Sequence, residues 1–282
     1  MIDFTKMHGL GNDYIYIELL NDKNIIVKED LPKLTRYLCN RHFGVGADGV
    51  ILVSKSEIAD FKMTIYNQDG SIAQMCGNGI RCFAKYVYEK GLTTNNIINI
   101  ETDSGIKQAY LSLENNQVIE VTVCMGNPIV DIQKLKEVGF ISDTINEKIK
   151  LSIDDMEIPV FPVSLGNPHV VIFVGKVDDF NVNKYGKMIE NDKIFPQKTN
   201  VEFVQLIDRG HIKMRVWERG VGETYACGTG ACAAAAVCIM KGYTRRHVTV
   251  NLKGGDLKIN WSIQDNNMYM SGIATKVFDG KI

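Results

Sequence analysis

The sequence has no excess of charge of either sign and no long apolar run. Its 282 residues carry 32 Lys and Arg and 33 Asp and Glu, a formal net charge of −1. A nucleic-acid-binding protein normally carries a basic surface, so this composition argues against that class. No apolar stretch approaches the length of a membrane span, and the first residues lack an apolar signal core. These absences favour a cytoplasmic protein with neither nucleic acid nor membrane as a partner.

Paired cysteine motifs are also missing. The seven cysteines form an odd number, and no two of them have the spacing Cys-x-x-Cys. Disulfide frameworks and structural zinc sites usually show an even count or such pairs, so the spacing argues against both. We therefore expect reduced thiols, as in the cytoplasm, and no metal.

One cysteine motif occurs twice. Cys76-Gly77-Asn78-Gly79 and Cys227-Gly228-Thr229-Gly230 are 151 residues apart, and the same offset aligns residues 62–67 with 213–218. A repeat of this length indicates an internal duplication, in which each half is one folding unit. The alternative is two unrelated α+β units that share common turn chemistry. The strand, the turn, the cysteine and the end of the helix all match between the two halves, which argues against that alternative.

Each motif precedes a stretch that predicts a helix, over residues 80–90 and 231–241. Both stretches end in Lys-Gly, a cation followed by a glycine cap. The second stretch includes four consecutive alanines and has no polar face, which predicts a helix buried inside a wrapped sheet. Free N–H groups at a helix N-terminus favour an anion, so we expect a lowered thiol pKa at Cys76 and Cys227. The other five cysteines lack this context, and the polar stretch 131–150 is expected to be a connection.

Several polar residues are candidates for ligand binding. Four asparagines lie at turns or strand ends in related positions of both halves: Asn12, Asn67, Asn167 and Asn200. Most asparagines at such places serve only the local backbone, but this set could converge on a polar ligand. Arg219, next to Glu218, could hold a carboxylate with its planar fork, although such a pair is usually solvated surface. His169 could tune the pKa of a thiol, although a lone histidine is more often structural.

In combination, the motifs resemble the diaminopimelate epimerase family. The matching stretches extend over most of the chain: residues 6–13, 41–48, 67–71, 76–82, 166–169, 199–201, 218–220, 222–224 and 226–233. The resemblance implies an α+β fold of two pseudo-symmetric lobes, each a mostly antiparallel β-sheet wrapped around a central helix, with the active site between them. We expect one lobe at residues 1–126 plus 272–282, with Cys76, and the other at 127–271, with Cys227.

The resemblance also implies a function. The family interconverts LL- and meso-2,6-diaminopimelate in lysine biosynthesis, without a cofactor and as a homodimer, and Cys76 and Cys227 match its two acid/base residues. His169 and Glu218 match positions that modulate these cysteines. Some members have a glutamine where Gly49 stands. The substrate contact that this glutamine makes in those members is in question here, because glycine has no side chain. The substrate-binding positions are matched by Asn12, Asn67, Gly77, Asn78, Asn167, Asn200, Glu218, Arg219, Gly228 and Thr229.

Three alternatives compete with this interpretation. A proline racemase-like enzyme of the same fold would share the cysteine pair, but residues 7–12 and 218–220 favour the epimerase. A thiol redox or metal-binding protein is disfavoured because Cys-x-x-Cys spacing is missing. A non-catalytic binding module is disfavoured because both cysteine motifs are intact.

Overall fold

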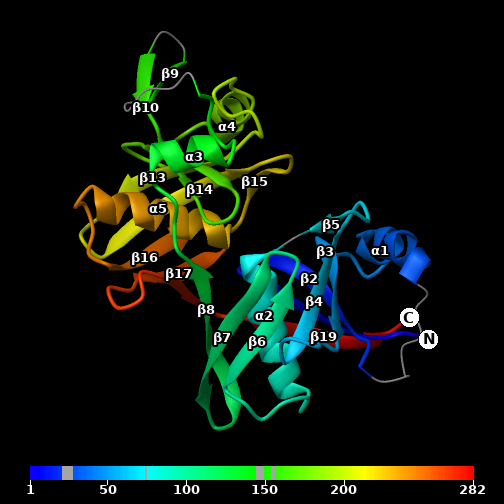
Figure 1. Ribbon diagram of the computed structural model, residues 1–282. Helices are drawn as coiled ribbons and strands as arrows, with labels where there is room; N and C mark the ends of the chain where they lie inside the picture. Colours follow the sequence, from blue (N-terminus) through cyan, green and yellow to red (C-terminus); the bar gives the residue numbers. More distant parts are fainter. Residues whose placement is uncertain (21–27, 74, 144–148, 154–155) are drawn as a thin grey trace. The chain divides into compact units, whose positions relative to one another are not determined.

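The protein divides into two compact units (Figure 1). Unit 1 comprises Met1–Cys124 and Ser271–Ile282, and unit 2 comprises Met125–Met270. Both contain sheets and helices, which confirms the expected α+β class. The lobe limits expected from the sequence stay a prediction. The computed structural model describes residues 1–20, 28–73, 75–143, 149–153 and 156–282.

In the described residues of unit 1, a sheet has α-helices on both of its faces. Its helices are α1 (Leu31–Cys39), preceded by a short 3-10 helix (Lys28–Asp30), and α2 (Gly77–Glu89). Its strands are β1 (Asp3–Gly9), β2 (Asn12–Glu18), β3 (Gly49–Ser54), β4 (Phe61–Asn67), β5 (Ile72–Ala73), β6 (Ile97–Thr102), β7 (Gly105–Glu114) and β19 (Thr275–Lys281), together with most of β8 (Gln117–Gly126), whose last two residues belong to unit 2.

Unit 2 contains three α-helices among its described residues. These are α3 (Ile132–Glu137), α4 (Val182–Glu190) and α5 (Gly228–Met240). Its strands are β9 (Lys150–Ile153), β10 (Met156–Pro159), β11 (Phe161–Ser164), β12 (Pro168–Phe173), β13 (Asn200–Leu206), β14 (His211–Glu218), β15 (Gly222–Thr224), β16 (His247–Leu252) and β17 (Gly255–Trp261), together with most of β18 (Met268–Gly272), whose last two residues belong to unit 1.

Both units have the same order of strand pairing. In unit 1, β1 is antiparallel to β2, β2 is parallel to β3, and β3 is antiparallel to β4. β4 then pairs antiparallel with β5 and parallel with β6, which is antiparallel to β7. Strands β11 to β17 repeat this order and these directions in unit 2. The repeated topology confirms the internal duplication and the mostly antiparallel sheets.

The central strands of unit 1 bury both of their faces. Successive side chains of a strand point to opposite faces of the sheet. On β2, Tyr16 therefore faces α2, where its hydroxyl donates to the Gly79 carbonyl at 2.9 Å. Ile15 and Ile17 face the other way and pack in one cluster with Leu38 of α1. β2 thus contacts α2, the helix capped by Cys76, on one face and the outer helix α1 on the other.

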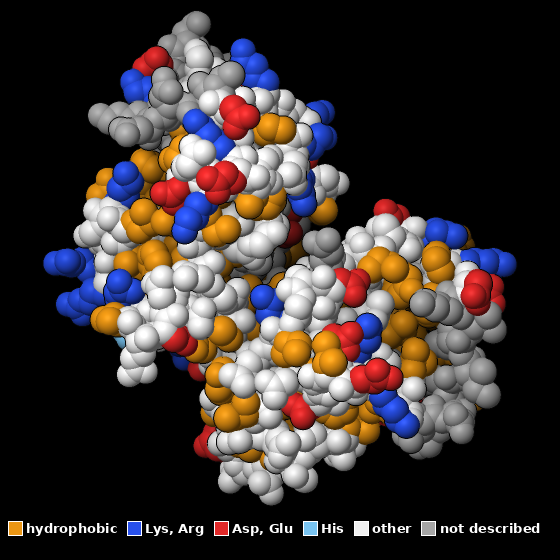
Figure 2. Space-filling model, viewed as in Figure 1, with side chains coloured by type: hydrophobic (Ala, Val, Ile, Leu, Met, Phe, Trp, Pro, Cys, Tyr) orange, Lys and Arg blue, Asp and Glu red, His pale blue; other side chains and the backbone are white. Residues whose placement is uncertain are grey.

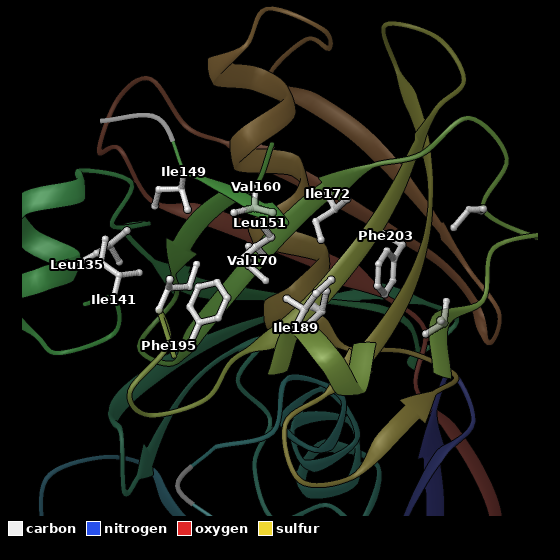
Figure 3. Packing of buried hydrophobic residues seen from close by; sticks show 14 residues of the cluster. Leu135, Ile141, Ile149, Leu151, Val160, Val170, Ile172, Ile189, Phe195 and Phe203 are labelled. Atoms are coloured by element: carbon white, nitrogen blue, oxygen red, sulfur yellow. The ribbon is translucent and has the colours of Figure 1, made fainter. Parts of the chain in front are cut away.

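Helix α5 is buried inside unit 2, as its apolar sequence predicts. Residues 231–238 are at most 4% exposed, and α5 packs against β11 to β14 and against β16 and β17. The opposite face of this sheet holds a second cluster, in which Leu135 of α3 and Ile189 of α4 share a core with Ile172 and Phe203 from the strands (Figure 3). Helices α3 and α4 therefore form the outer layer of unit 2.

Several element boundaries differ from the sequence expectation. The two cysteine helices begin at Gly77 and Gly228, three residues early, because each preceding cysteine caps the first turn. The expected connection at 131–150 contains α3, and its residues 144–148 lie outside the described residues. Helix α4 was not expected; it is only nine residues long, and Gly186 in its centre lowers the local helix propensity.

The surface agrees with the near-neutral composition. Charged groups of both signs are mixed on the face shown in Figure 2. Among the described residues, every helix is too short or too polar to span a membrane.

Candidate active site

Both motif cysteines are N-caps of the central helices. Cys76 caps α2 and accepts a hydrogen bond from the Gly79 N–H at a sulfur-to-nitrogen distance of 3.3 Å. Cys227 caps α5 and accepts one from the Gly230 N–H at 3.4 Å. In both, the sulfur takes the place that a serine or aspartate oxygen usually occupies at an N-cap. The duplication therefore places two thiols in equivalent positions, each at the positive end of a helix.

Asn12 and Tyr14 contact the sulfur of Cys76. The Cys76 thiol donates to Asn12 Oδ1 at 3.3 Å, and the Tyr14 hydroxyl donates to Cys76 Sγ, also at 3.3 Å. The amide of Asn12 is oriented by Asp48, whose Oδ2 accepts from Asn12 Nδ2 at 2.8 Å. Arg41 holds Asp48 in turn through an ion pair of 2.8 Å. The structure thus brings Asn12 to the thiol and adds Tyr14, which the sequence motifs did not mark because it lies inside an apolar strand.

The first turn of α2 is held by a fully buried arginine. Arg81 donates to the Gly77 carbonyl at 3.1 Å and to Asn78 Oδ1 at 3.0 Å. Asn78 Nδ2 reaches Asn12 Oδ1 at 3.5 Å, so the structure brings Gly77 and Asn78 into the group around Cys76. Arg81 follows the Gly-Asn-Gly turn inside a helix, where an arginine normally points to solvent. Only the tertiary structure identifies it as a residue that positions the site.

Two further positions of unit 1 have local roles. The Asn67 side chain donates to Ser71 Oγ at 3.0 Å and so stabilises the turn after β4. A Cβ atom at Gly49 would lie 2.4 Å from the Tyr66 carbonyl oxygen and 2.8 Å from the Tyr14 ring. No side chain fits there without displacement of the neighbouring strand, and the Tyr14 ring occupies the adjacent space.

The surroundings of Cys227 contain two carboxyl groups. Burial raises its pKa well above the ordinary thiol value, and the charges of Glu218 and Glu202 raise it further. Hydrogen bonds from Thr229 and the Gly230 N–H lower it, but by less. The expectation of a lowered thiol pKa is therefore wrong for Cys227, because lost hydration and two nearby acids outweigh the helix N-terminus. Burial also raises the pKa of Glu218 itself.

His169 lies between two oxygen acceptors. Its Nδ1 is 2.7 Å from Glu202 Oε1, and its Nε2 is 2.9 Å from Asn167 Oδ1. Within the described residues it makes no hydrogen bond to Cys227, so a direct contact does not explain how it would modulate the thiol. The sequence analysis missed Glu202. The available signal was an acidic residue in an otherwise apolar strand, with valine on one side and phenylalanine on the other.

Asn200 organises the turn that carries Arg219. Its Oδ1 accepts from the Arg219 N–H at 2.9 Å, and its Nδ2 donates to the Pro168 carbonyl at 2.9 Å. The Arg219 side chain is exposed and donates through Nη1 to the Gln197 carbonyl at 2.9 Å. The structure therefore brings Asn200, Glu218 and Arg219 together at the end of β14.

Away from the two cysteines, the features that could form a second site are metal-binding groups, disulfides and cavities. In the described part of the chain, no three His, Cys, Asp or Glu residues are grouped so that they could hold a metal ion. All seven cysteines are free thiols. A cavity of about 340 Å³ in unit 2 is lined mainly by apolar side chains, among them Val130, Phe161 and Val237, and it includes none of the candidate site residues.

Comparison with solved structures defines the class of fold. Over 100% of this chain and 93% of the other, it is similar to a probable proline racemase from Agrobacterium radiobacter, with a TM-score of 0.70 and 14% identity. It is similar to a phenazine biosynthesis protein of the PhzF family from Bacillus anthracis, with a TM-score of 0.69 and 17% identity, over 100% and 99% of the two chains. The protein therefore has the duplicated α+β fold of these proteins.

Comparison of sequences identifies the family. The family model described as diaminopimelate epimerase matches residues 4–130 and 161–277. The chain is 48% identical over 279 residues to a diaminopimelate epimerase from Methanococcus maripaludis, covering 99% of each protein. It is 48% identical over 286 residues to one from Agathobacter rectalis, covering 99% of this chain and 98% of that protein. The chain belongs to the diaminopimelate epimerase family.

Proposed function

We propose that the protein interconverts LL- and meso-2,6-diaminopimelate by acid/base chemistry at Cys76 and Cys227. The observation that carries this proposal is the equivalent placement of the two thiols, each the N-cap of a central helix in one copy of the duplication. Near-full-length identity to relatives named diaminopimelate epimerase supports the choice of substrate. As parts of the same proposal, the reaction serves lysine biosynthesis in the cytoplasm, and the enzyme is a homodimer that uses no cofactor.

Inversion of a carbon centre needs a base on one face and an acid on the other. One cysteine, as thiolate, removes the α-hydrogen, and the other, as thiol, delivers a proton to the opposite face. The carbon is inverted, and the two cysteines exchange protonation states. The raised pKa of Cys227 supports a neutral thiol, ready to donate, at this position in the free protein.

The α-hydrogen of an amino acid is a very weak acid, so the carbanion must be stabilised. Backbone N–H groups in the first turns of α2 and α5 supply fixed positive dipoles for the charge that builds on the α-carboxylate. We assign Gly77 and Asn78, with Gly228 and Thr229, to this role. The remaining contacts to the substrate are assigned to Asn12, Asn67, Asn167, Asn200, Glu218 and Arg219, with His169 and Glu218 as modulators of the thiols.

The proposal is tested by incubating the protein with LL-diaminopimelate in deuterated water. We expect the meso isomer to appear, with deuterium at the inverted α-carbon, because the new proton comes from a thiol that has exchanged with solvent. Proline is the comparison substrate. Deuteration of proline without any conversion of diaminopimelate would assign the protein to the racemase alternative.

Replacement of Arg219 by lysine should impair substrate binding although the charge is kept. A lysine ammonium lacks the planar fork that binds a carboxylate through two parallel hydrogen bonds. We expect kcat/KM to fall by roughly 10-fold or more, on the order of one charge-assisted hydrogen bond. Arg209→Lys, in another exposed turn of unit 2, is the matched control and should leave kcat/KM unchanged. Equal kcat/KM for Arg219→Lys and the wild type would exclude a bidentate contact.

A further inference from the structure

Two consecutive N–H groups of the loop that joins β14 to β15 are bonded by side chains from outside this hairpin. The Arg219 N–H donates to Asn200 Oδ1 at 2.9 Å. The Gly220 N–H donates to Glu190 Oε1, also at 2.9 Å. Both loop residues are exposed, so water could satisfy their N–H groups. Instead, two side chains that are each only 5% exposed hold the loop.

Glu190, the last residue of α4, is a buried carboxylate that none of the sequence motifs mark. Its second oxygen, Oε2, accepts from Trp217 Nε1 at 2.8 Å. Lys198 lies 3.9 Å from Oε1, but its side chain is 56% exposed, so it offsets little of the cost of taking a carboxylate out of water. An indole N–H and a backbone N–H can only donate, so the direction of both bonds is fixed. Two such donors facing one side chain need two acceptor oxygens, which a carboxylate supplies.

Helix α4 fixes the hairpin at two points. It packs against β14 and β15, and its Gly186 lies so close to Trp217 that a Cβ atom there would be 2.5 Å from the Trp217 Cβ. Glu190, one turn further along the helix, bonds the indole of the same tryptophan and the N–H of Gly220. One of these two bonded residues precedes Arg219 and the other follows it. The carboxylate therefore restrains the backbone on both sides of Arg219.

The side chain of Arg219 is restrained by the same part of the chain. Its Nη1 donates to the carbonyl of Gln197, in the connection that follows α4, at 2.9 Å. Among the described residues this is the one side-chain hydrogen bond of the guanidinium, and it does not use the edge formed by Nε and Nη2. Two parallel N–H donors on one edge of a guanidinium match the two oxygens of a carboxylate.

We infer that Glu190 is a positioning residue: its two oxygens hold the loop on both sides of Arg219, so that the guanidinium is presented to a carboxylate of the substrate. The use of Arg219 on the substrate rests on the proposed function. The hold of Glu190 on the loop does not.

The first test is hydrogen exchange of the full-length protein, followed by NMR of the nitrogen-bound protons. The Gly220 N–H and the Trp217 indole N–H should exchange slowly in the wild type, and at least about tenfold faster in Glu190→Leu, which lacks both acceptors. The other tryptophan of the chain, Trp261, donates to Asn266 instead and is the internal reference. A wild-type Gly220 N–H that exchanges like an unbonded loop amide overturns the inference, and this result does not depend on the variant.

The second test is the kinetics of the epimerase reaction. Glu190→Leu should raise KM for diaminopimelate about tenfold, on the order of one hydrogen bond to a charged group, with kcat changed less than about twofold. Glu190→Gln keeps one acceptor oxygen and should give an intermediate KM, which decides the case if the leucine variant does not fold. A purely structural role would lower the melting temperature and leave the KM of the folded enzyme unchanged, and that result would overturn the inference.

Asn181→Ala is the matched control for these variants. Asn181 is the N-cap of the same helix, where its Oδ1 accepts from the Lys184 N–H at 3.0 Å, and it lies at the opposite end from Glu190. Loss of the cap should lower the melting temperature and leave KM as in the wild type. An equal rise of KM in Asn181→Ala would assign the effect to the stability of α4 and overturn the role of Glu190.

A double-mutant cycle tests the link to Arg219. Glu190→Leu combined with Arg219→Lys should raise KM little beyond Arg219→Lys alone, because both changes weaken the same contact. Fully multiplicative effects would overturn the link. Absence of all epimerase activity in the wild type would refute the proposed function, whereas the exchange measurement would still decide whether Glu190 holds the loop.

Discussion

Replacement of either Cys76 or Cys227 by alanine is expected to abolish epimerisation. Each thiol serves one face of the substrate carbon, so neither can take over the proton transfer of the other. A single general acid or base contributes about 10²–10⁴-fold, and we expect each variant to lose at least that much of kcat/KM. The measurement is conversion of LL-diaminopimelate to the meso isomer, with a circular dichroism spectrum to confirm that the variant is folded.

Cys238→Ala is the matched control for the cysteine variants. Cys238 is a buried thiol of the same helix as Cys227, but it lies in the helix interior and not at the N-cap. This variant should lose little activity. Near-normal turnover by Cys76→Ala would refute the two-base mechanism, and equal losses in all three variants would point to a folding defect instead.

Replacement of Gly186 by alanine is expected to destabilise unit 2 strongly. A Cβ atom at this position of α4 would lie 2.5 Å from both Cβ and Cγ of Trp217, and the Trp217 Cβ cannot move without its backbone. Overpacking of this kind costs about 1–3 kcal/mol, which exceeds the gain of about 0.5–1 kcal/mol from alanine in a helix. The melting temperature should fall by roughly 2–4 °C for each kcal/mol of net loss.

The same substitution should disturb the turn of Arg219. Glu190, on the same helix as Gly186, accepts from Trp217 Nε1 at 2.8 Å and from the Gly220 N–H at 2.9 Å. A shift of α4 away from Trp217 would loosen both hydrogen bonds, so we expect KM to rise together with the loss of stability. Gly175→Ala is the control, because a Cβ atom there meets no heavy atom within 4 Å. If the two variants melt at the same temperature, the packing argument is wrong.

Much of the site could be predicted because its signals are local in the chain. A cysteine followed by Gly-x-Gly and a helical stretch predicts a thiol close to a helix N-terminus, and the structure makes each cysteine the N-cap itself. The repeat of this pattern predicted the duplication, and four adjacent alanines predicted a buried helix. Local patterns did not predict α4, a nine-residue helix whose central Gly186 packs against Trp217 of a distant strand.

By itself, the sequence determined the duplicated α+β fold, the two cysteines near helix N-termini and the family, because each depends on neighbouring residues or on a repeated order of elements. Only the tertiary structure decided what surrounds each sulfur. Glu202 and His169 are 33 residues apart in the chain, yet they form a buried hydrogen bond of 2.7 Å. The direction of the Cys227 pKa shift was likewise decided by burial and by two carboxylates from separate strands. Hydration and charge at a site depend on which distant residues the fold brings together, and no local pattern encodes that.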